Sequence, residues 1–155
     1  MKKVLFISST GGHLNELLQL KPIFKNYDSY LITEKTKTTL NLEKDYKNVD
    51  YLLYGTKHTP LKYIYVSIRN IFKSIRLYHK IKPDVIVTTG AHTCVPMCYI
   101  AKLHRKKIIY IETFANINSK TLTGKLVYPI ANVFVVQWES MLKLYPKAVY
   151  WGWIF

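Results

Sequence analysis

Cysteine, acidic charge and long apolar runs are all scarce in this sequence. Its two cysteines, Cys94 and Cys98, stand four residues apart, which matches neither a CxxC redox pair nor a zinc knuckle. We therefore expect two reduced thiols in a cytosolic protein. The apolar run after Lys3 ends at Ser8, too short for a signal peptide, and no uncharged run reaches the roughly 20 residues that span a bilayer. These absences predict a chain that is neither secreted nor able to cross a membrane by itself.

The shortage of acidic residues leaves a strongly basic chain. Aspartate and glutamate number 9 against 23 lysines and arginines, for a formal net charge of +14. This excess predicts acidic partners: nucleic acid, anionic lipid headgroups or phosphorylated substrates. No helix-turn-helix, RRM, KH or zinc pattern accompanies the charge, so we favour a lipid-linked phosphate over nucleic acid. The 155 residues are expected to form a single domain over 1–155.

Apolar, β-branched runs alternate with helical patterns along the whole chain. Strands are expected at 3–7, 29–33, 49–54, 84–88, 107–112, 133–136 and 148–151. Helices are expected at 13–25, 36–46, 61–81, 93–103, 122–131 and 139–144. This alternation predicts an α/β fold, a Rossmann-like doubly wound parallel sheet. Ligands of such sheets bind outside the carboxyl ends of the strands.

Two glycine turns follow predicted strands and are candidate anion sites. Gly11 and Gly12 precede His13 after the first strand, and Gly90 precedes Thr93 after the fourth. Glycines there let backbone N–H groups approach a phosphate at the start of a helix. Two such turns on one sheet edge favour a diphosphate ligand. A plain tight turn is the alternative for the glycines. His13 is a candidate general base or phosphate donor, and a helix-capping or core role is its alternative.

Carboxylates at the same edge are candidates for proton transfer or sugar binding. Glu112 ends the fifth predicted strand and is expected to point into the same crevice, with a helix-capping role as its alternative. Glu16 stands one helical turn after His13.

The helix predicted at 61–81 carries an apolar stripe with a basic flank. The stripe comprises Leu61, Ile64, Tyr65, Ile68, Ile71, Phe72, Ile75 and Tyr78. The flank comprises Lys62, Arg69, Lys73, Arg76, Lys80 and Lys82. We expect the centre of the stripe to pack on the sheet. The flank, of which we single out Lys62, Arg69, Lys73 and Arg76, suits an anionic membrane surface.

The C-terminal residues Trp151, Trp153, Ile154 and Phe155 are unusually apolar for the end of a chain. We interpret them as a seat for a partner protein. The alternative is a last strand and its cap that fold back on the core.

Together, these motifs resemble one family over essentially the whole chain. The matching segments are 83–90, 93–96, 111–114, 122–125, 134–138, 145–148 and Gly152. In this order they resemble the acceptor-side subunit of the two-subunit UDP-GlcNAc transferase of asparagine-linked glycosylation. The eukaryotic members carry an N-terminal membrane anchor, whereas this chain begins at its first strand. It is therefore more similar to the bacterial PssD/CpsF-type proteins of capsule and exopolysaccharide biosynthesis.

The resemblance implies half of a split, inverting GT-B glycosyltransferase, equivalent to its N-terminal domain. A partner protein would hold most of the UDP-sugar donor, and this chain would bind an undecaprenyl-diphosphate-linked acceptor at the inner face of the cell membrane. No metal or cofactor is expected. His13 is the first choice for the catalytic base and Glu112 the second, with Glu16 orienting the imidazole. The cradle for the acceptor diphosphate would comprise Gly11, Gly12, Gly90 and Thr93.

Two other classes of function remain open at this point. The chain could be a membrane scaffold that recruits and activates a catalytic partner without supplying catalytic residues. It could also be a stand-alone α/β protein that binds nucleotides or nucleic acid.

Overall fold

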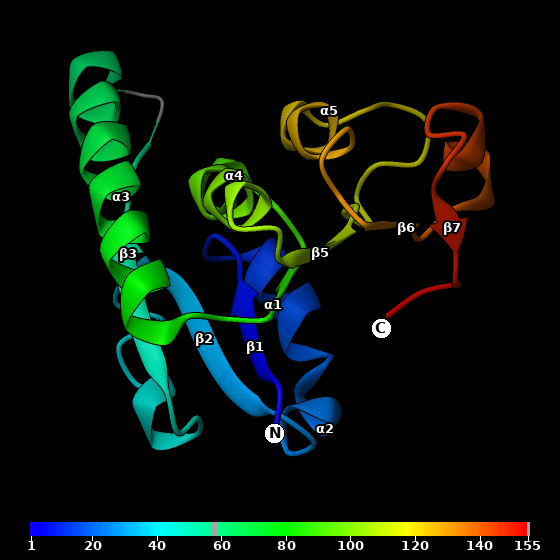
Figure 1. Cartoon of the computed structure of the whole chain (residues 1–155). Coiled ribbons are helices and arrows are strands. Elements are labelled where there is room, and N and C mark those ends of the chain that lie inside the picture. The colour runs from blue at the N-terminus through cyan, green and yellow to red at the C-terminus, as the bar shows by residue number, and fades with distance from the viewer. Residues whose placement is uncertain (57–58, 155) are drawn as a thin grey trace.

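The computed structural model describes residues 1–56 and 59–154 and shows one seven-stranded parallel sheet with helices on both faces (Figure 1). The strands are β1 (Lys3–Ile7), β2 (Asp28–Lys35), β3 (Val49–Leu53), β4 (Val85–Thr88), β5 (Lys107–Ile111), β6 (Val133–Val136) and β7 (Val149–Tyr150). They lie in the order β3-β2-β1-β4-β5-β6-β7, and all neighbours are parallel. The strand order reverses between β1 and β4, where doubly wound sheets form their ligand crevice. The predicted fold class is confirmed.

The helices agree with most of the predicted segments. They are α1 (Gly12–Leu18), α2 (Lys21–Phe24), α3 (Pro60–Ile81), α4 (Val95–Leu103) and α5 (Leu122–Val127). Single 3-10 turns form at Leu42–Lys44, His92–Cys94 and Glu139–Lys143. The helix predicted at 13–25 is divided into α1 and α2, with Pro22 in the first turn of α2, where its missing N–H costs little.

The prediction of a full helix at 36–46 is wrong. Thr39 Oγ1 donates to Glu34 O at 2.7 Å and accepts from the Thr36 N–H at 2.9 Å. Threonine side chains that bond nearby backbone groups in this way offer the chain an alternative to the helical hydrogen-bond ladder. Only the 3-10 turn at Leu42–Lys44 forms in this segment.

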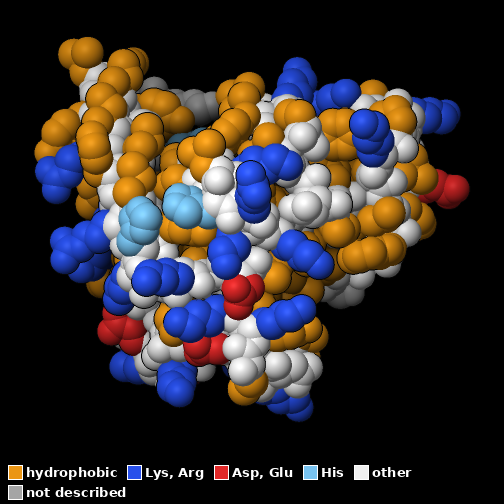
Figure 2. Space-filling view, viewed as in Figure 1, with side chains coloured by type: hydrophobic (Ala, Val, Ile, Leu, Met, Phe, Trp, Pro, Cys, Tyr) orange, Lys and Arg blue, Asp and Glu red, His pale blue; other side chains and the backbone are white. Residues whose placement is uncertain are grey.

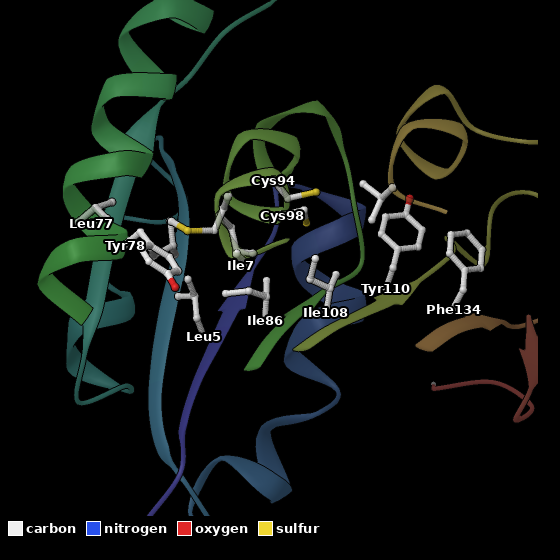
Figure 3. Close-up of a cluster of buried hydrophobic side chains, with 14 of the residues drawn as sticks. Leu5, Ile7, Leu77, Tyr78, Ile86, Cys94, Cys98, Ile108, Tyr110 and Phe134 are labelled. Carbon is white, nitrogen blue, oxygen red and sulfur yellow. The ribbon is translucent and has the colours of Figure 1, made fainter. Parts of the chain in front are cut away.

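Two hydrophobic cores lie on opposite faces of the sheet. Leu5 and Ile7 of β1 contribute to the core beneath α3, α4 and α5, much of which Figure 3 shows. Val4 and Phe6 contribute to the other core, against α1. This alternation is the period of two that a strand covered on both faces requires. Both cysteines, Cys94 and the α4 residue Cys98, are free and buried in the first core.

The long helix α3 turns its apolar stripe outward. Leu61, Ile68 and Phe72 are 85%, 49% and 67% exposed, so the expectation that the centre of the stripe packs on the sheet is wrong. Tyr78, near the end of the helix, is the stripe residue that is buried. The inward face of the helix consists instead of Val66, Asn70, Ser74, Leu77, Tyr78 and Ile81.

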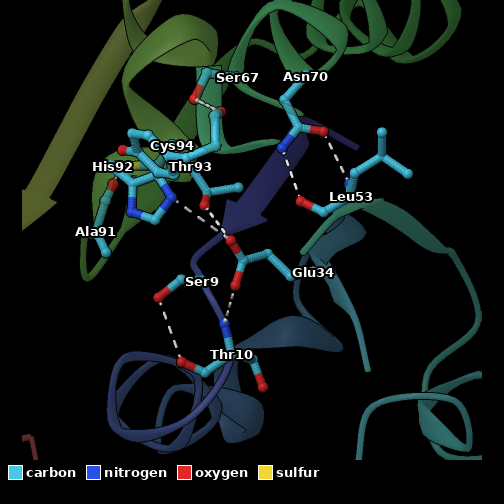
Figure 4. Close-up of polar contacts among 11 residues, drawn as sticks. Ser9, Thr10, Glu34, Leu53, Ser67, Asn70, Ala91, His92, Thr93 and Cys94 are labelled. Carbon is cyan, nitrogen blue, oxygen red and sulfur yellow. Dashed lines mark hydrogen bonds and ion pairs between the residues drawn. The ribbon is translucent and has the colours of Figure 1, made fainter. Parts of the chain in front are cut away.

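Asn70 contributes to this orientation of α3. Its side-chain amide donates to the Leu53 carbonyl and accepts from the Leu53 N–H, both at 2.8 Å (Figure 4). Leu53 ends β3, an edge strand whose outer backbone groups have no neighbouring strand among the residues that the structure describes. Turning the stripe inward would break both bonds, and an unsatisfied buried polar group costs about 1–3 kcal/mol.

Candidate functional site

The two glycine turns meet at the carboxyl edge of the sheet. β1 and β4 are parallel neighbours, so the turns that follow them leave from the same edge. The Ser9 N–H donates to the Gly90 carbonyl at 3.3 Å and links the first turn to the second. The predicted proximity of the two turns is confirmed.

The first turn leaves its backbone uncovered. Gly11 has φ +78°, a left-handed conformation that glycine adopts without strain. Gly11 and Gly12 are exposed, and a Cβ atom built at either position would meet nothing within 4 Å. The turn therefore offers open space in which a ligand can approach the backbone closely.

His13 stands beside this space with its ring held by the second turn. Its Nδ1 contacts the Thr89 carbonyl oxygen at 2.8 Å, and Thr89 Oγ1 donates to the His13 carbonyl at 2.6 Å. A carbonyl oxygen only accepts hydrogen bonds, so Nδ1 carries the proton. In the neutral ring the lone pair is then on Nε2, which is the arrangement of a general base.

The second turn is built from internal hydrogen bonds. The Gly90 N–H donates to Thr88 Oγ1 at 3.0 Å, and Gly90 has φ +97°. A Cβ atom at Gly90 would lie 3.0 Å from the Tyr110 hydroxyl and 3.5 Å from the His13 ring. Thr93 is buried, and its hydroxyl donates to Glu34 Oε1 at 2.5 Å. Gly90 and Thr93 thus use their polar groups to shape this turn, whereas Gly11 and Gly12 lie open.

Glu34 is a site residue that the sequence reasoning missed. It lies in β2 and is 2% exposed, yet its Oε2 accepts from the Thr10 N–H at 3.3 Å and its Oε1 binds Thr93 (Figure 4). His92 Nε2 lies 3.9 Å from the same Oε1. The buried Glu34 carboxylate therefore connects the first glycine turn, through Thr10, with the second, through Thr93. The sequence signal that could have found Glu34 is a carboxylate directly after the strand predicted at 29–33.

Glu16 is buried in α1, and its carboxylate accepts hydrogen bonds from residues other than His13. Its Oε1 accepts from Thr113 Oγ1 at 2.8 Å and from the Phe114 N–H at 3.1 Å, and its Oε2 accepts from Gln137 Nε2 at 3.3 Å. Burial raises the pKa of the carboxyl above its ordinary value, whereas these hydrogen bonds and the electrostatic interaction with the nearby His13 oppose the rise. The backbone of Thr89, rather than Glu16, makes the orienting contact with the imidazole.

Glu112 is directed at α5, which differs from the expectation that it points into the crevice. It is 1% exposed, and it accepts from the Tyr145 hydroxyl at 2.8 Å and from Thr121 Oγ1 at 2.9 Å. Thr121 also caps α5 by accepting from the Gly124 N–H. Burial first, and then the Glu112 charge, raise the pKa of Tyr145, which keeps that hydroxyl a donor. The arrangement is that of a carboxylate that holds the structure together.

The C-terminal segment lies partly on the fold. The ring of Trp153 is 5.3 Å from that of Phe114 and 5.1 Å from that of Trp138, centroid to centroid. The Ile154 N–H donates to Gln137 Oε1 at 3.1 Å. Trp151 and Trp153 nevertheless remain 68% and 56% exposed. Phe155, which we also assigned to the partner interface, lies outside the described residues.

The four basic residues singled out on α3 share the surface of that helix with the exposed stripe. Lys62, Arg69 and Arg76 are exposed and Lys73 is half-buried. Among residues 1–56 and 59–154, no helix has the length and apolarity to cross a membrane. Within the same residues, no group of three or more His, Cys, Asp or Glu side chains is placed to hold a metal ion.

A parallel sheet with this strand order is a Rossmann-like fold, which one half of solved GT-B glycosyltransferase and epimerase structures shares. MurG from Acinetobacter baumannii matches 90% of the chain with a TM-score of 0.69 at 17% identity. The UDP-N-acetylglucosamine 2-epimerase from Rickettsia bellii matches 99% with a TM-score of 0.73 at 18% identity. The chain spans 43% and 45% of those two structures. At these identities the likeness establishes the fold.

The sequence comparisons identify the family within this fold. Residues 55–154 match the family model described as "Oligosaccharide biosynthesis protein Alg14 like". The UDP-N-acetylglucosamine transferase subunit ALG14 of Candida albicans is 41% identical over 162 residues, covering 92% of this chain and 74% of the relative. Its human counterpart is 26% identical over 176 residues, covering 96% and 81%. The chain belongs to the Alg14 family.

Proposed function

We propose that this chain is the membrane-associated, acceptor-binding subunit of a two-component inverting hexosyltransferase. Its membership of the Alg14 family supports this proposal, because curated relatives are named as subunits of a UDP-N-acetylglucosamine transferase. In this proposal, residues 1–155 form one acceptor-binding domain. The complex transfers a sugar from a UDP-sugar to a saccharide on undecaprenyl diphosphate. The pathway is that of the PssD/CpsF-type proteins, capsule or exopolysaccharide biosynthesis.

The contact between His13 and Thr89 carries the catalytic part of the proposal. With Nδ1 protonated, Nε2 is free to take the proton of the acceptor hydroxyl while the hydroxyl oxygen bonds to the anomeric carbon. UDP leaves with the electron pair of the broken bond, and the configuration inverts. We assign the two buried carboxylates, Glu16 and Glu112, to holding the walls of the site, because their oxygens already accept hydrogen bonds.

We assign the acceptor diphosphate to the two glycine turns. Gly11 and Gly12 leave space beside the backbone, which allows the close approach that a phosphate needs. The turn from Gly90 to Thr93 is the adjoining wall, and its internal hydrogen bonds keep it rigid.

The outward stripe of α3 is the proposed membrane contact. Exposed apolar side chains flanked by Lys62, Arg69, Lys73 and Arg76 form an amphipathic surface that suits anionic lipid. Membrane binding through this surface would make the chain a peripheral protein on the cytoplasmic side of the cell membrane, close to a lipid-linked acceptor.

We assign most of the donor site to a partner protein, with no metal ion or cofactor in the reaction. The proposed partner contact is the C-terminal segment of Trp151, Trp153, Ile154 and Phe155. The exposure of its first two tryptophans supports this assignment, since large aromatic residues are favoured at protein interfaces.

A transfer assay tests the function. Membranes with a lipid-linked acceptor and labelled UDP-sugars are incubated with this chain, with its partner, and with both; we expect transfer with both. His13→Ala should lower the turnover by about 10²–10⁴, the usual contribution of a general base. His104→Ala is the matched control, because His104 Nδ1 also contacts a backbone carbonyl, that of Ile100 at 2.9 Å, but lies at the end of α4.

A non-catalytic scaffold is the second candidate function. The observation in its favour is that both acidic residues considered for catalysis, Glu16 and Glu112, are buried and hydrogen-bonded. If the partner transfers sugar at a near-normal rate with the His13→Ala chain, and the two proteins still bind each other, the scaffold is correct and His13 is not the base.

A further inference from the structure

A hollow of about 530 Å³ lies between the edge strand β3 and the helix α3. It is lined by Asp50, Leu53, Arg69, Phe72, Lys73, Arg76, Leu77 and Lys80. Four of these side chains are cationic and one is anionic. Charges of one sign gathered in a concave site raise the local concentration of ions of the other sign.

The single carboxylate of the hollow is already paired. Lys80 Nζ lies 2.9 Å and 3.2 Å from the two Asp50 carboxylate oxygens. The remaining cations, Arg69, Lys73 and Arg76, therefore give the hollow an excess of positive charge. Arg69 is oriented by a 2.8 Å hydrogen bond to the Tyr65 hydroxyl, one helical turn away.

Lys73 is the most enclosed of these cations. Burial lowers the pKa of its ammonium, and the neighbouring charges of Lys35, Arg69 and Arg76 lower it further, while Asp50 opposes them. An anion bound in the hollow would relieve this repulsion. The hollow is therefore chemically suited to a phosphate or another compact anion.

The hollow opens beside the exposed apolar stripe. Phe72 belongs to both, since it lines the hollow and is 67% exposed. Figure 2 shows the exposed hydrophobic side chains along α3 with Lys and Arg side chains next to them. A ligand that fills the hollow with a phosphate and covers the neighbouring stripe must also carry apolar chains. A membrane phospholipid has both groups.

We propose that the hollow between β3 and α3 binds the phosphate headgroup of one anionic membrane lipid, with Lys73 and Arg76 on the phosphate and Phe72 among the acyl chains. The proposal rests on the membrane contact proposed for α3 and goes beyond it. A basic surface attracts negative charge in general, whereas a headgroup site makes the affinity depend on the particular side chains that line it.

Removal of the one carboxylate gives a test in which binding increases. Asp50→Asn should tighten binding of the full chain to vesicles of phosphatidylcholine with phosphatidylglycerol by at least about fivefold, because a like charge leaves the site and Lys80 becomes available. Asp84→Asn is the matched control: it makes the same change in net charge at an ion pair with Lys106 outside the hollow. The control should change the affinity less than about twofold, because general attraction is screened over about 10 Å.

Removal of a cation gives the complementary test. Lys73→Gln should weaken vesicle binding roughly 30-fold, the loss expected for a charged hydrogen bond of about 2 kcal/mol. Lys62→Gln, on the same helix but outside the hollow, should cost about fivefold, the usual effect of one basic residue near an anionic surface. Phe72→Ser tests the membrane contact itself.

The outcomes separate the two proposals. Equal effects of Asp50→Asn and Asp84→Asn, together with equal effects of Lys73→Gln and Lys62→Gln, would overturn the headgroup site while leaving the membrane contact in place. No binding of the wild-type chain to anionic vesicles would overturn both. If inorganic phosphate without vesicles gives the same difference between Asp50→Asn and its control, the site takes free phosphate and the lipid assignment is wrong.

Discussion

The substitution Gly124→Ala reverses the expectation from helix propensity. Gly124 lies inside α5, and replacing an internal helical glycine by alanine ordinarily stabilises a helix by up to about 1 kcal/mol. In this fold, however, the new Cβ atom would overlap Glu112 Oε2 and the Tyr145 hydroxyl and would lie 2.8 Å from Thr121 Oγ1. None of these atoms can withdraw easily, because Glu112 and Tyr145 are buried.

The size of the destabilisation follows from the hydrogen bonds to Glu112 that the new Cβ atom would displace. Tyr145 and Thr121 donate to the Glu112 carboxylate at 2.8 Å and 2.9 Å, and a hydrogen bond to a charged group contributes about 1.5–3 kcal/mol. Complete loss of both bonds would cost about 3–6 kcal/mol, and because the displaced carboxylate keeps part of them, we expect a loss of about 3–5 kcal/mol. After the gain in helix propensity, we expect Gly124→Ala to lower the free energy of unfolding by about 2–4 kcal/mol.

Urea unfolding measures this change. With a denaturant slope of about 2 kcal/mol per molar, the midpoint should fall by about 1–2 M. Gly12→Ala is the matched control, since Gly12 is also helical but its Cβ would meet nothing within 4 Å; its midpoint should be equal to or slightly above that of the wild type. In a Tyr145→Phe background, which lacks one of the overlapping hydroxyls, Gly124→Ala should cost less. An unchanged or higher midpoint for Gly124→Ala would refute the packing argument.

Three further results are expected. Phe72→Ser should leave the free energy of unfolding within about 0.5 kcal/mol, because the ring is 67% exposed, yet it should weaken vesicle flotation; unfolding at markedly lower urea would show that the stripe packs internally. The raised pKa of Glu16 means that the folded state binds the Glu16 carboxyl proton more tightly than the unfolded state does. The free energy of unfolding should therefore fall as the pH rises from the ordinary pKa of 4.5 through the raised pKa of the folded state. Glu16→Gln should flatten the dependence of the free energy of unfolding on pH in this range. An unchanged slope would show that another group causes the pH dependence. Trp151→Ala should reduce co-purification with the partner while leaving the unfolding midpoint unchanged. An undiminished yield of the complex would show that Trp151 is not part of the interface.

The carboxyl-edge site could be predicted in part from local patterns. The apolar, β-branched runs predicted strands at 3–7 and 84–88, and the turns after parallel strands necessarily share an edge. Gly11 and Gly90 could therefore be assigned to one edge of the sheet from their positions after predicted strands. Glu34 could not, because it reaches Thr93 across 59 residues and only the strand order β2-β1-β4 brings them together.

The carboxylates show a second limit of local patterns. Position along the chain placed Glu112 at the end of a strand and Glu16 one turn after His13; the structure has Glu112 directly after β5 and Glu16 in α1 with His13. The direction of each side chain depends on hydrogen-bond donors supplied by distant segments, such as Tyr145 for Glu112 and Gln137 for Glu16. Local spacing contains no information about which donors arrive there.

By itself, the sequence determined the alternation of strands and helices, the doubly wound class, the two glycine turns and the presence of an amphipathic α3. Each of these is a periodicity or a turn signal within a few residues. Only the tertiary structure decided that the apolar stripe of α3 faces outward and that Asn70 faces the sheet. Periodicity shows that a helix has two different faces, but the free energy that selects the buried one is the sum of long-range contacts. Here the backbone N–H and C=O of Leu53 at the sheet edge favour the face of α3 that carries Asn70, because the Asn70 amide binds both of them.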